Sequence, residues 1–229
     1  MARFGLLRSF QRLALLLLVP VLVSCSTTPR AAVAQGCSDA MAACLQGRTS
    51  VLVSTTRGDF TVEVDGDAAP LTAGNFVDLV RRGTYDGTMF HRVIREPVPF
   101  VAQGGDPLSS DRSTPLNQLG TGNFVDPQTG QVRMIPLELR FDGEAEPRYS
   151  RVVSNPAEID RLMLRHERGA VAMAWSQSPD SASAQFYVAL RPLPELDGRY
   201  AVFGRVVDGL DVVDAIEQGD RITKVSLKD

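Results

Sequence analysis

The sequence predicts a mainly β protein built as a mostly antiparallel barrel with two or three helices. Three observations support this class: many short strand patterns, few helix patterns, and no alternation of the two that would indicate β-α-β units. The chain has 229 residues, 44% hydrophobic and 22% charged, which suits one domain of good size with an ordinary globular core. We find no internal repeat and expect no second folded domain.

Residues 1–24 predict a signal peptide of the lipoprotein type. Three arginines and no acidic residue accompany an apolar stretch over residues 13–23, which is too short for a comfortable permanent membrane span. The stretch runs into Leu-Val-Ser-Cys, which resembles a bacterial lipobox, so Cys25 is the expected lipidated first residue of the mature protein. Ser26 favours the outer over the inner membrane, with the domain in the periplasm. Ordinary cleavage after the Ala-Val-Ala of residues 32–34 is the alternative.

The charge of the exported part argues against a nucleic-acid partner. The whole chain has 24 basic and 27 acidic residues, and loss of the three signal arginines changes its net charge from −3 to −6. Nucleic-acid surfaces are basic. The expected membrane contact is the lipid on Cys25. The protein is expected to be a monomer.

Residues 25–48 predict a flexible tether, and the folded domain is expected over residues 49–229. The tether is rich in small and polar residues and lacks the large apolar ones that would order it. It contains Cys37 and Cys44, which an oxidising compartment could join in a disulfide. On a straight helix they would lie about 10 Å apart, so a bridge requires a bend between them. Two free thiols are the other interpretation.

The domain is expected to open with a β-hairpin. Residues 51–56 form a β-branched run, residues 60–64 alternate apolar and polar side chains, and Arg57-Gly58-Asp59 lies between them. The same tripeptide is an integrin-binding motif, but a hairpin turn explains it far better.

Three segments predict helices. The first opens at Pro70 with Thr72 as its N-cap and ends near Gly83. The second starts at Asn155, whose side chain is a good cap, and the third spans about residues 210–217. Strands are expected at 169–175, 185–190, 200–207 and 222–227, whereas residues 107–133 predict a long irregular loop.

The central stretch is residues 85–106, where two strand patterns carry the chemistry. Arg92 lies between apolar neighbours in the first, and Phe100, Val101 and Gln103 follow in the second, before Gly104-Gly105. These residues supply a guanidinium, a neutral amide and an apolar wall, without a nucleophile. Such a set suits a reaction that polarises a bond without breaking it.

Five blocks of sequence then indicate a family. They are YDGTMFHRVI, FVAQGGD, RGAVAMA, DSASAQFYV and LDGRYAVFGRV, which occur in this order between about residues 51 and 227. Together they resemble the cyclophilin-type peptidyl-prolyl cis-trans isomerases, particularly bacterial ones. The resemblance implies a closed eight-stranded antiparallel barrel capped by helices, with an active groove on its outer surface and no cofactor.

The resemblance also implies roles for particular residues. Arg92 corresponds to the catalytic arginine, and Gln103 to the glutamine that hydrogen-bonds the substrate backbone. Phe100, Val101, Tyr187 and Leu196 correspond to the apolar seat for the proline ring. The remaining groove positions correspond to Ala174, Trp175, Gln185 and Tyr200.

Two kinds of observation bear on this assignment: the alternation of side chains along the strands, and positions where this sequence differs from the family pattern. Gln185 and Tyr187 should share one face, with Phe186 on the other. Five residues, 95–99, stand where the family has two, and could shift Phe100 away from Arg92. Glu195 replaces a tryptophan linked to cyclosporin binding, Trp175 replaces an asparagine, and Tyr200 replaces a histidine.

Other chemistry finds little support. His91 should point away from Arg92 and is expected to be a structural, hydrogen-bonded residue. Two histidines and two separated cysteines do not make a zinc site, so no metal is expected. The expected function is isomerisation of X–Pro bonds in exported polypeptides. The alternative is a proline-peptide binding module or envelope scaffold without turnover.

Overall fold

The computed structural model describes Met1, residues 36–37 and residues 44–228. Contacts divide the chain into residues 1–30 and 31–229, and the architecture below concerns the second unit. The signal peptide, Cys25 and the Ala-Val-Ala site lie outside the described residues. Within them, no helix has the length and apolar character needed to cross a membrane.

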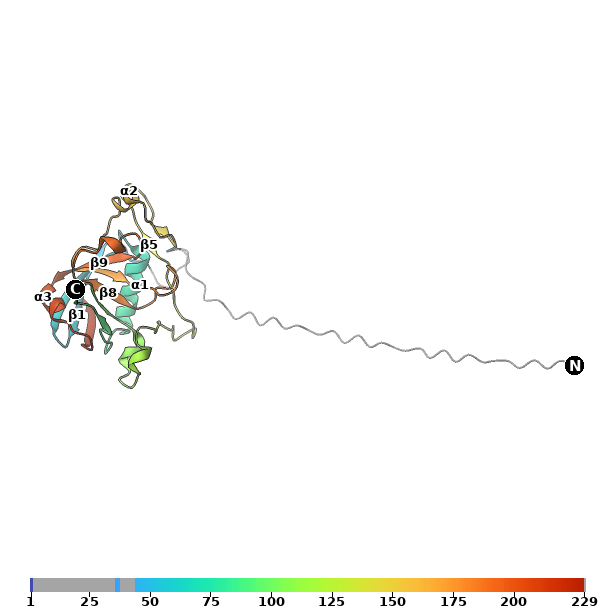
Figure 1. Cartoon of the computed structure of the whole chain (residues 1–229), viewed down its shortest axis with the longest axis horizontal. Coiled ribbons are helices and arrows are strands. Elements are labelled where there is room, and N and C mark those ends of the chain that lie inside the picture. The colour runs from blue at the N-terminus through green and yellow to red at the C-terminus, as the bar shows by residue number, and fades with distance from the viewer. Residues whose placement is uncertain (2–35, 38–43, 229) are drawn as a thin grey trace. The chain divides into compact units, whose positions relative to one another are not determined.

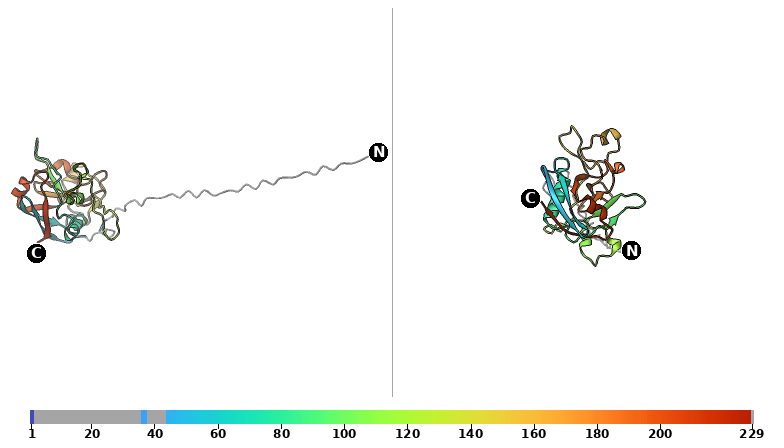
Figure 2. Two further views of the ribbon diagram at one scale, coloured as in Figure 1. Left: turned by 90° about the horizontal axis from the view of Figure 1, so that it is seen from below. Right: turned by 90° about the vertical axis from the view of Figure 1, so that its left-hand side faces the viewer.

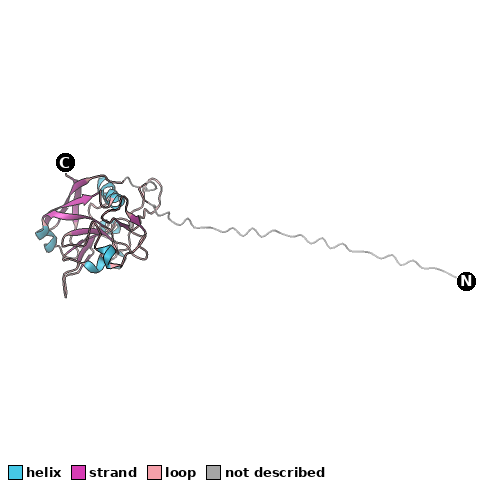
Figure 3. Ribbon diagram, turned by 90° about the horizontal axis from the view of Figure 1, so that it is seen from above, coloured by secondary structure: helices cyan, strands magenta, loops and turns pink. Residues whose placement is uncertain are grey.

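The fold is mainly β and centres on one curled antiparallel sheet of eight strands (Figures 1 and 3). The strands lie in the order β10-β1-β2-β9-β7-β8-β4-β3. Their bounds are β1 Arg48–Thr55, β2 Gly58–Asp65, β3 Arg92–Val93, β4 Val101–Gly104, β7 Ala170–Met173, β8 Phe186–Ala189, β9 Val202–Asp208 and β10 Ile222–Leu227. A separate pair joins β5 Glu138–Leu139 to β6 Arg148–Tyr149.

The sheet is a half-barrel, and the closed barrel expected from the sequence is wrong. The end strands β3 and β10 are not paired with each other. Residues 87–90, which precede β3, are instead joined to residues 219–222 by backbone hydrogen bonds and an isolated antiparallel bridge between Met89 and Arg221. The physical reason is the register of this antiparallel contact: β3 follows residues 87–90 in the chain, so it extends beyond the start of β10 at Ile222 and does not lie along it.

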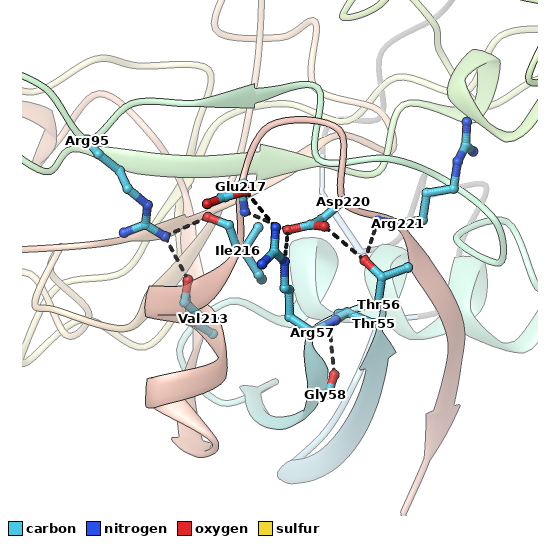
Figure 4. Close-up of polar contacts among 10 residues, drawn as sticks. All are labelled: Thr55, Thr56, Arg57, Gly58, Arg95, Val213, Ile216, Glu217, Asp220 and Arg221. Carbon is cyan, nitrogen blue, oxygen red and sulfur yellow. Dashed lines mark hydrogen bonds and ion pairs between the residues drawn. The ribbon is translucent and has the colours of Figure 1, made fainter.

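The β1–β2 hairpin forms with the expected turn at Arg57. Residues 48–55 pair in register with residues 58–65. The guanidinium of Arg57 donates to Asp220 at 2.7 Å and to Glu217 at 2.6 Å, so the arginine of the tripeptide stabilises the fold (Figure 4).

Helix α1, Pro70–Arg81, lies against β2, β9 and β10 and supplies much of the core. Phe76 meets Tyr85, Phe186 and Phe203 with ring centroids 4.9 to 5.5 Å apart. Buried aromatic rings of this size contribute strongly to core stability.

The N-terminus of α1 is capped by a residue that the sequence did not predict. The N-cap is Ala69, and Thr72 is buried inside the helix, so the prediction of Thr72 as the cap is wrong. The carboxylate of Glu138 in β5 accepts hydrogen bonds from the backbone N–H groups of Leu71 at 3.1 Å and Thr72 at 2.8 Å. A residue 66 positions away thus does what a local cap usually does.

The other helices are shorter than expected. Helix α2 spans Pro156–Ile159, and its cap Asn155 accepts from the N–H of Ala157 at 3.0 Å. Met163 lies beyond the end of this helix and is 43% exposed. Helix α3 spans Leu210–Ala215 and packs on β2.

The long loop is irregular but well anchored. Two 3-10 turns, Pro107–Ser110 and Leu116–Gln118, lie within it. The buried carboxylate of Asp106 accepts from the N–H groups of Leu108 at 2.9 Å and Gly120 at 2.5 Å. At the far end the buried Arg133 pairs with Asp78 of α1 at 2.6 Å.

The chain just before β1 packs against the domain. Residues 44–48 were assigned to the tether, yet Leu45 donates its N–H to the carbonyl of Pro70 at 2.9 Å, and β1 begins at Arg48. The structure joins Cys37 and Cys44 in a disulfide whose Cα atoms are 5.7 Å apart.

Candidate active site

The site is built on three neighbouring strands, β3, β4 and β8. Arg92 of β3 lies opposite Gln103 of β4, which lies opposite Tyr187 of β8. The guanidinium of Arg92 donates to Oε1 of Gln103 at 3.2 Å, and the amide of Gln103 donates to Oε1 of Gln185 at 3.3 Å. Gln185 donates in turn to the carbonyl of Gly122 at 2.9 Å. A continuous polar line therefore runs from Arg92 to the long loop.

A pocket of about 280 Å³ is bordered by Arg92. Its lining comprises Arg92, Phe100, Val101, Gln103, Ala174, Trp175, Tyr187, Leu196 and Tyr200. All nine are among the ten groove residues predicted from sequence. Strand parity accounts for those that lie within β4 and β8, because Phe186 and Val188 fill the core while Tyr187 lies on the outer face.

The tenth predicted residue, Gln185, lines a second pocket of about 290 Å³. This pocket shares Gln103, Ala174 and Trp175 with the first, so the two form one groove. Seven further lining residues were not predicted: Gly120, Thr121, Asn123, Ser176, Gln177, Ser181 and Ser183. The length of the 107–133 loop could have indicated the first three, whereas the other four lie in the connection between β7 and β8, which overlaps the block DSASAQFYV.

The longer connection formed by residues 95–99 does not separate Phe100 from Arg92. The N–H of Phe100 donates to the carbonyl of Ile94 at 2.9 Å, and the N–H of Ile94 donates to the carbonyl of Val101 at the same distance. These bonds close the base of a hairpin, and residues 95–99 loop out as an arm that projects from the body (Figure 2). Val98 near its tip is 54% exposed.

The base of the arm is tied to the segment after α3. Arg95 donates to the carbonyls of Val213 at 3.1 Å and Ile216 at 2.7 Å (Figure 4). Both carbonyls belong to the end of α3, where a cation satisfies groups that the helix leaves unpaired. The insertion therefore adds an anchor beside the two-residue strand that carries Arg92.

Aromatic side chains form the opposite wall. Trp175 stacks on Tyr200 with centroids 5.0 Å apart, and Tyr200 meets Tyr187 edge to face at 5.8 Å. Burial raises the pKa of Tyr187 well above its usual value, so its hydroxyl stays protonated. Glu195 is exposed and pairs with Arg191 at 2.6 Å, and neither residue is part of the pocket lining.

His91 takes no part in either pocket lining. Its ring nitrogens make no hydrogen bond to the described residues, so the expectation of a hydrogen-bonded histidine is wrong. Burial lowers the pKa of His91, which keeps the ring neutral. The described residues also contain no group of three or more His, Cys, Asp or Glu side chains arranged for a metal ion.

The electrostatics of the groove are simple. Within the described part of the chain, Arg92 is the only charged side chain that lines either pocket. It is exposed at the rim, and its neighbours are amides, hydroxyls and rings. The groove can therefore bind a neutral, partly apolar segment and direct one cation at it.

The model of the cyclophilin type peptidyl-prolyl cis-trans isomerase family matches residues 50–228. The chain belongs to this family. The domain is thus a cyclophilin domain, and its type of activity is peptidyl-prolyl cis-trans isomerisation.

Individual relatives agree with this assignment. The cyclophilin domain is 38% identical over 193 residues to a protein of Synechocystis sp. named as a thylakoid lumen peptidyl-prolyl cis-trans isomerase, a match that covers 80% of this chain and 48% of that protein. It is 32% identical over 166 residues to the peptidyl-prolyl cis-trans isomerase-like 1 of Rhizopus delemar, covering 72% and 78%. The chain therefore spans about half the length of the first relative and most of the second.

Solved structures show the same fold. A cyclophilin type isomerase of Cryptosporidium parvum matches with a TM-score of 0.58 at 23% identity, covering 80% of this chain and 98% of that one. The structure of the same protein in the presence of the dipeptide Ala-Pro matches with a TM-score of 0.57 at 24% identity.

Proposed function

We propose that this protein isomerises X–Pro peptide bonds of exported polypeptides in the groove between Arg92 and Leu196. The single observation that carries the proposal is the pocket in which the guanidinium of Arg92 borders an apolar seat of Phe100, Tyr187 and Leu196. A proline ring is neutral and apolar, which suits such a seat. The Cryptosporidium structure with Ala-Pro supports a proline-containing ligand by analogy.

The mechanism follows from the resonance of the X–Pro bond. Its partial double-bond character opposes rotation with a barrier of about 18–20 kcal/mol. A donor directed at the prolyl nitrogen localises the lone pair there and weakens the resonance. Arg92 suits this task because a guanidinium stays protonated and holds its donors in a rigid fork.

The surrounding groups would favour the twisted bond over both planar forms. Gln103 bonds to Arg92 at 3.2 Å, which restricts the guanidinium, and its own amide donor faces Gln185. We assign Gln103 to the substrate backbone and Gln185, with Ala174 and Trp175, to the residues that precede the proline. Catalysis then rests on tighter binding of the twisted state than of the planar states.

Turnover of a short X–Pro peptide by the protein and its Arg92→Ala variant tests this function. We expect catalysis that falls sharply in the variant. A folded protein that binds the peptide without turnover would instead support the second candidate, a proline-peptide binding module. The seating of Phe100 beside Arg92 despite the insertion favours the enzyme.

For the location, we propose export and a lipid anchor at Cys25, with the domain in the periplasm and the outer membrane as the host. The lipobox-like residues 22–25 and the named thylakoid-lumen relative support an exported protein. The intact mass of the mature protein tests the anchor. A species that begins at Gln35 without lipid would contradict it and favour the Ala-Val-Ala site.

A further inference from the structure

A buried histidine lies behind the proposed proline seat and contacts one of its lining residues. His166 is 2% exposed and comes from the loop before β7. Its Nε2 lies 2.8 Å from the hydroxyl of Tyr187, and its Nδ1 lies 2.7 Å from Oδ1 of Asp197. The three side chains form one chain of hydrogen bonds that begins at the pocket wall and ends inside the protein.

The direction of these bonds follows from the partners. Oδ1 of Asp197 accepts both from Nδ1 and from the backbone N–H of His166, which lies 2.8 Å away, so the ring hydrogen belongs on Nδ1. In the neutral ring, Nε2 is then the acceptor, and the Tyr187 hydroxyl donates to it. The Tyr187 ring also lies nearly parallel to the imidazole, with centroids 5.9 Å apart and planes 11° apart.

The same histidine holds the turn that carries Leu196. The backbone carbonyl of His166 accepts from the N–H of Leu193 at 2.7 Å, and Asp197 directly follows Leu196. Leu193 and Asp197 flank the 3-10 turn Pro194–Leu196. The imidazole is therefore bonded directly to Tyr187, and His166 is joined through Asp197 and Leu193 to the turn that carries Leu196; Tyr187 and Leu196 both line the pocket.

We propose that His166, oriented by Asp197, is a positioning residue for the isomerase reaction, because it fixes the Tyr187 ring in the wall of the proline seat. This inference rests on the proposed placement of that seat. His166 does not touch the substrate. Its contribution is to keep the seat preformed, so that peptide binding need not order the ring.

Two substitutions separate the contacts of the imidazole. His166→Asn keeps a donor near the position of Nδ1, toward Asp197, and loses the group that meets Tyr187. His166→Gln places an amide oxygen near the position of Nε2, where it can accept from the Tyr187 hydroxyl. Tyr187→Phe removes that hydroxyl and keeps the ring, and Tyr149→Phe is its matched control, because Tyr149 bonds Glu138 away from the groove.

The test measures binding and turnover of a short Ala-Pro peptide. Binding can be followed by the fluorescence of Trp175, the single tryptophan of the chain, which lines the pocket. We expect His166→Asn and Tyr187→Phe each to weaken binding by on the order of two- to tenfold, the range of one ordinary hydrogen bond. His166→Gln and Tyr149→Phe should bind nearly as the unmodified protein does.

The double variant His166→Asn/Tyr187→Phe shows whether His166 acts through the Tyr187 hydroxyl. If His166 acts through the Tyr187 hydroxyl, His166→Asn has no further effect in the Tyr187→Phe background. An undiminished effect there, or unchanged binding in a folded Tyr187→Phe variant, overturns the proposal. If His166→Asn does not fold, the comparison of Tyr187→Phe with Tyr149→Phe decides alone.

A separate variant checks the seat itself. Phe100→Ala should weaken peptide binding whatever the role of His166. Unchanged binding in this variant would overturn the placement of the seat and with it this inference. Weakened binding in Phe100→Ala together with unchanged binding in Tyr187→Phe would overturn the role of His166 alone.

Discussion

Arg92 and Gln103 lie opposite each other on β3 and β4, and Nη1 of the arginine donates to Oε1 of the glutamine at 3.2 Å. This contact orients the only charged side chain that the described residues contribute to the groove. It also connects that charge, through Gln185, to the loop that lines the second pocket.

Replacement of Arg92 by alanine should lower kcat/KM by about tenfold to a hundredfold. A hydrogen bond from a charged donor contributes roughly 1.5–3 kcal/mol, and about 1.4 kcal/mol corresponds to a factor of ten in rate. Stability should hardly change, because the side chain is exposed at the rim. Peptide turnover and thermal unfolding of the variant check both statements, and a large fall in Tm would contradict this placement. Arg92→Lys keeps the charge but loses the planar guanidinium with its fixed donors, so its kcat/KM should also be lowered.

The arm should be dispensable for turnover of a short peptide. Hydrogen bonds between residue 94 and residues 100 and 101 close its base, so Val98→Ser alters only an exposed position. We expect kcat/KM to stay within about twofold, as for an exposed substitution away from the site. Phe100→Ala, at the base of the same hairpin, is the matched variant that should lose activity. A gain in activity on shortening the arm would show instead that the insertion hinders the site.

Loss of the Glu138 carboxylate should destabilise the domain. Glu138→Ala removes the acceptor for two N–H groups at the start of α1, which should lower the free energy of unfolding by about 1–2 kcal/mol. Glu138→Gln keeps an acceptor oxygen and should lower the free energy of unfolding by less. Chemical unfolding measures both, and equal losses would argue against the capping role.

Acid should weaken the contact between α1 and the long loop through Asp78. Burial opposes ionisation, but hydrogen bonds from Arg133 and Arg82 outweigh it and lower the pKa of Asp78 below the ordinary value of 3.8. An acid whose folded pKa is depressed binds fewer protons when folded, so its stabilisation is complete above the unfolded pKa. That stabilisation is then lost as the pH falls through the folded pKa.

The Asp78→Asn variant measures this effect. At neutral pH the variant should be less stable than the unmodified protein, because Arg133 is buried and loses an ionic partner. The difference in unfolding free energy should shrink as the pH falls below about 4, where the carboxylate of the unfolded chain takes up a proton. A difference that is constant from neutral pH to about pH 3 would contradict the shifted pKa of Asp78.

Much of the groove could be predicted because its residues follow local rules. Alternation of side chains along β8 predicted that Tyr187 lies on the outer face of the sheet and Phe186 in the core. The five ordered blocks predicted that Arg92 and Gln103 lie on adjacent strands. The hairpin at Arg57 and the cap at Asn155 also formed as predicted, since each depends on a few neighbouring residues. The disulfide between residues 37 and 44 was left open, because its formation depends on a bend that spacing alone does not set.

By itself, the sequence determined the class of fold, the family and nine residues of one pocket, because strand periodicity and motif order act at short range. Only the tertiary structure decided that the sheet stays open, that Glu138 caps α1, and that His166 lies behind the seat. Each of these depends on segments that are distant in sequence and meet only in the folded chain. No local pattern encodes such a meeting, because buried polar groups take whichever partner the packed structure brings within hydrogen-bond reach.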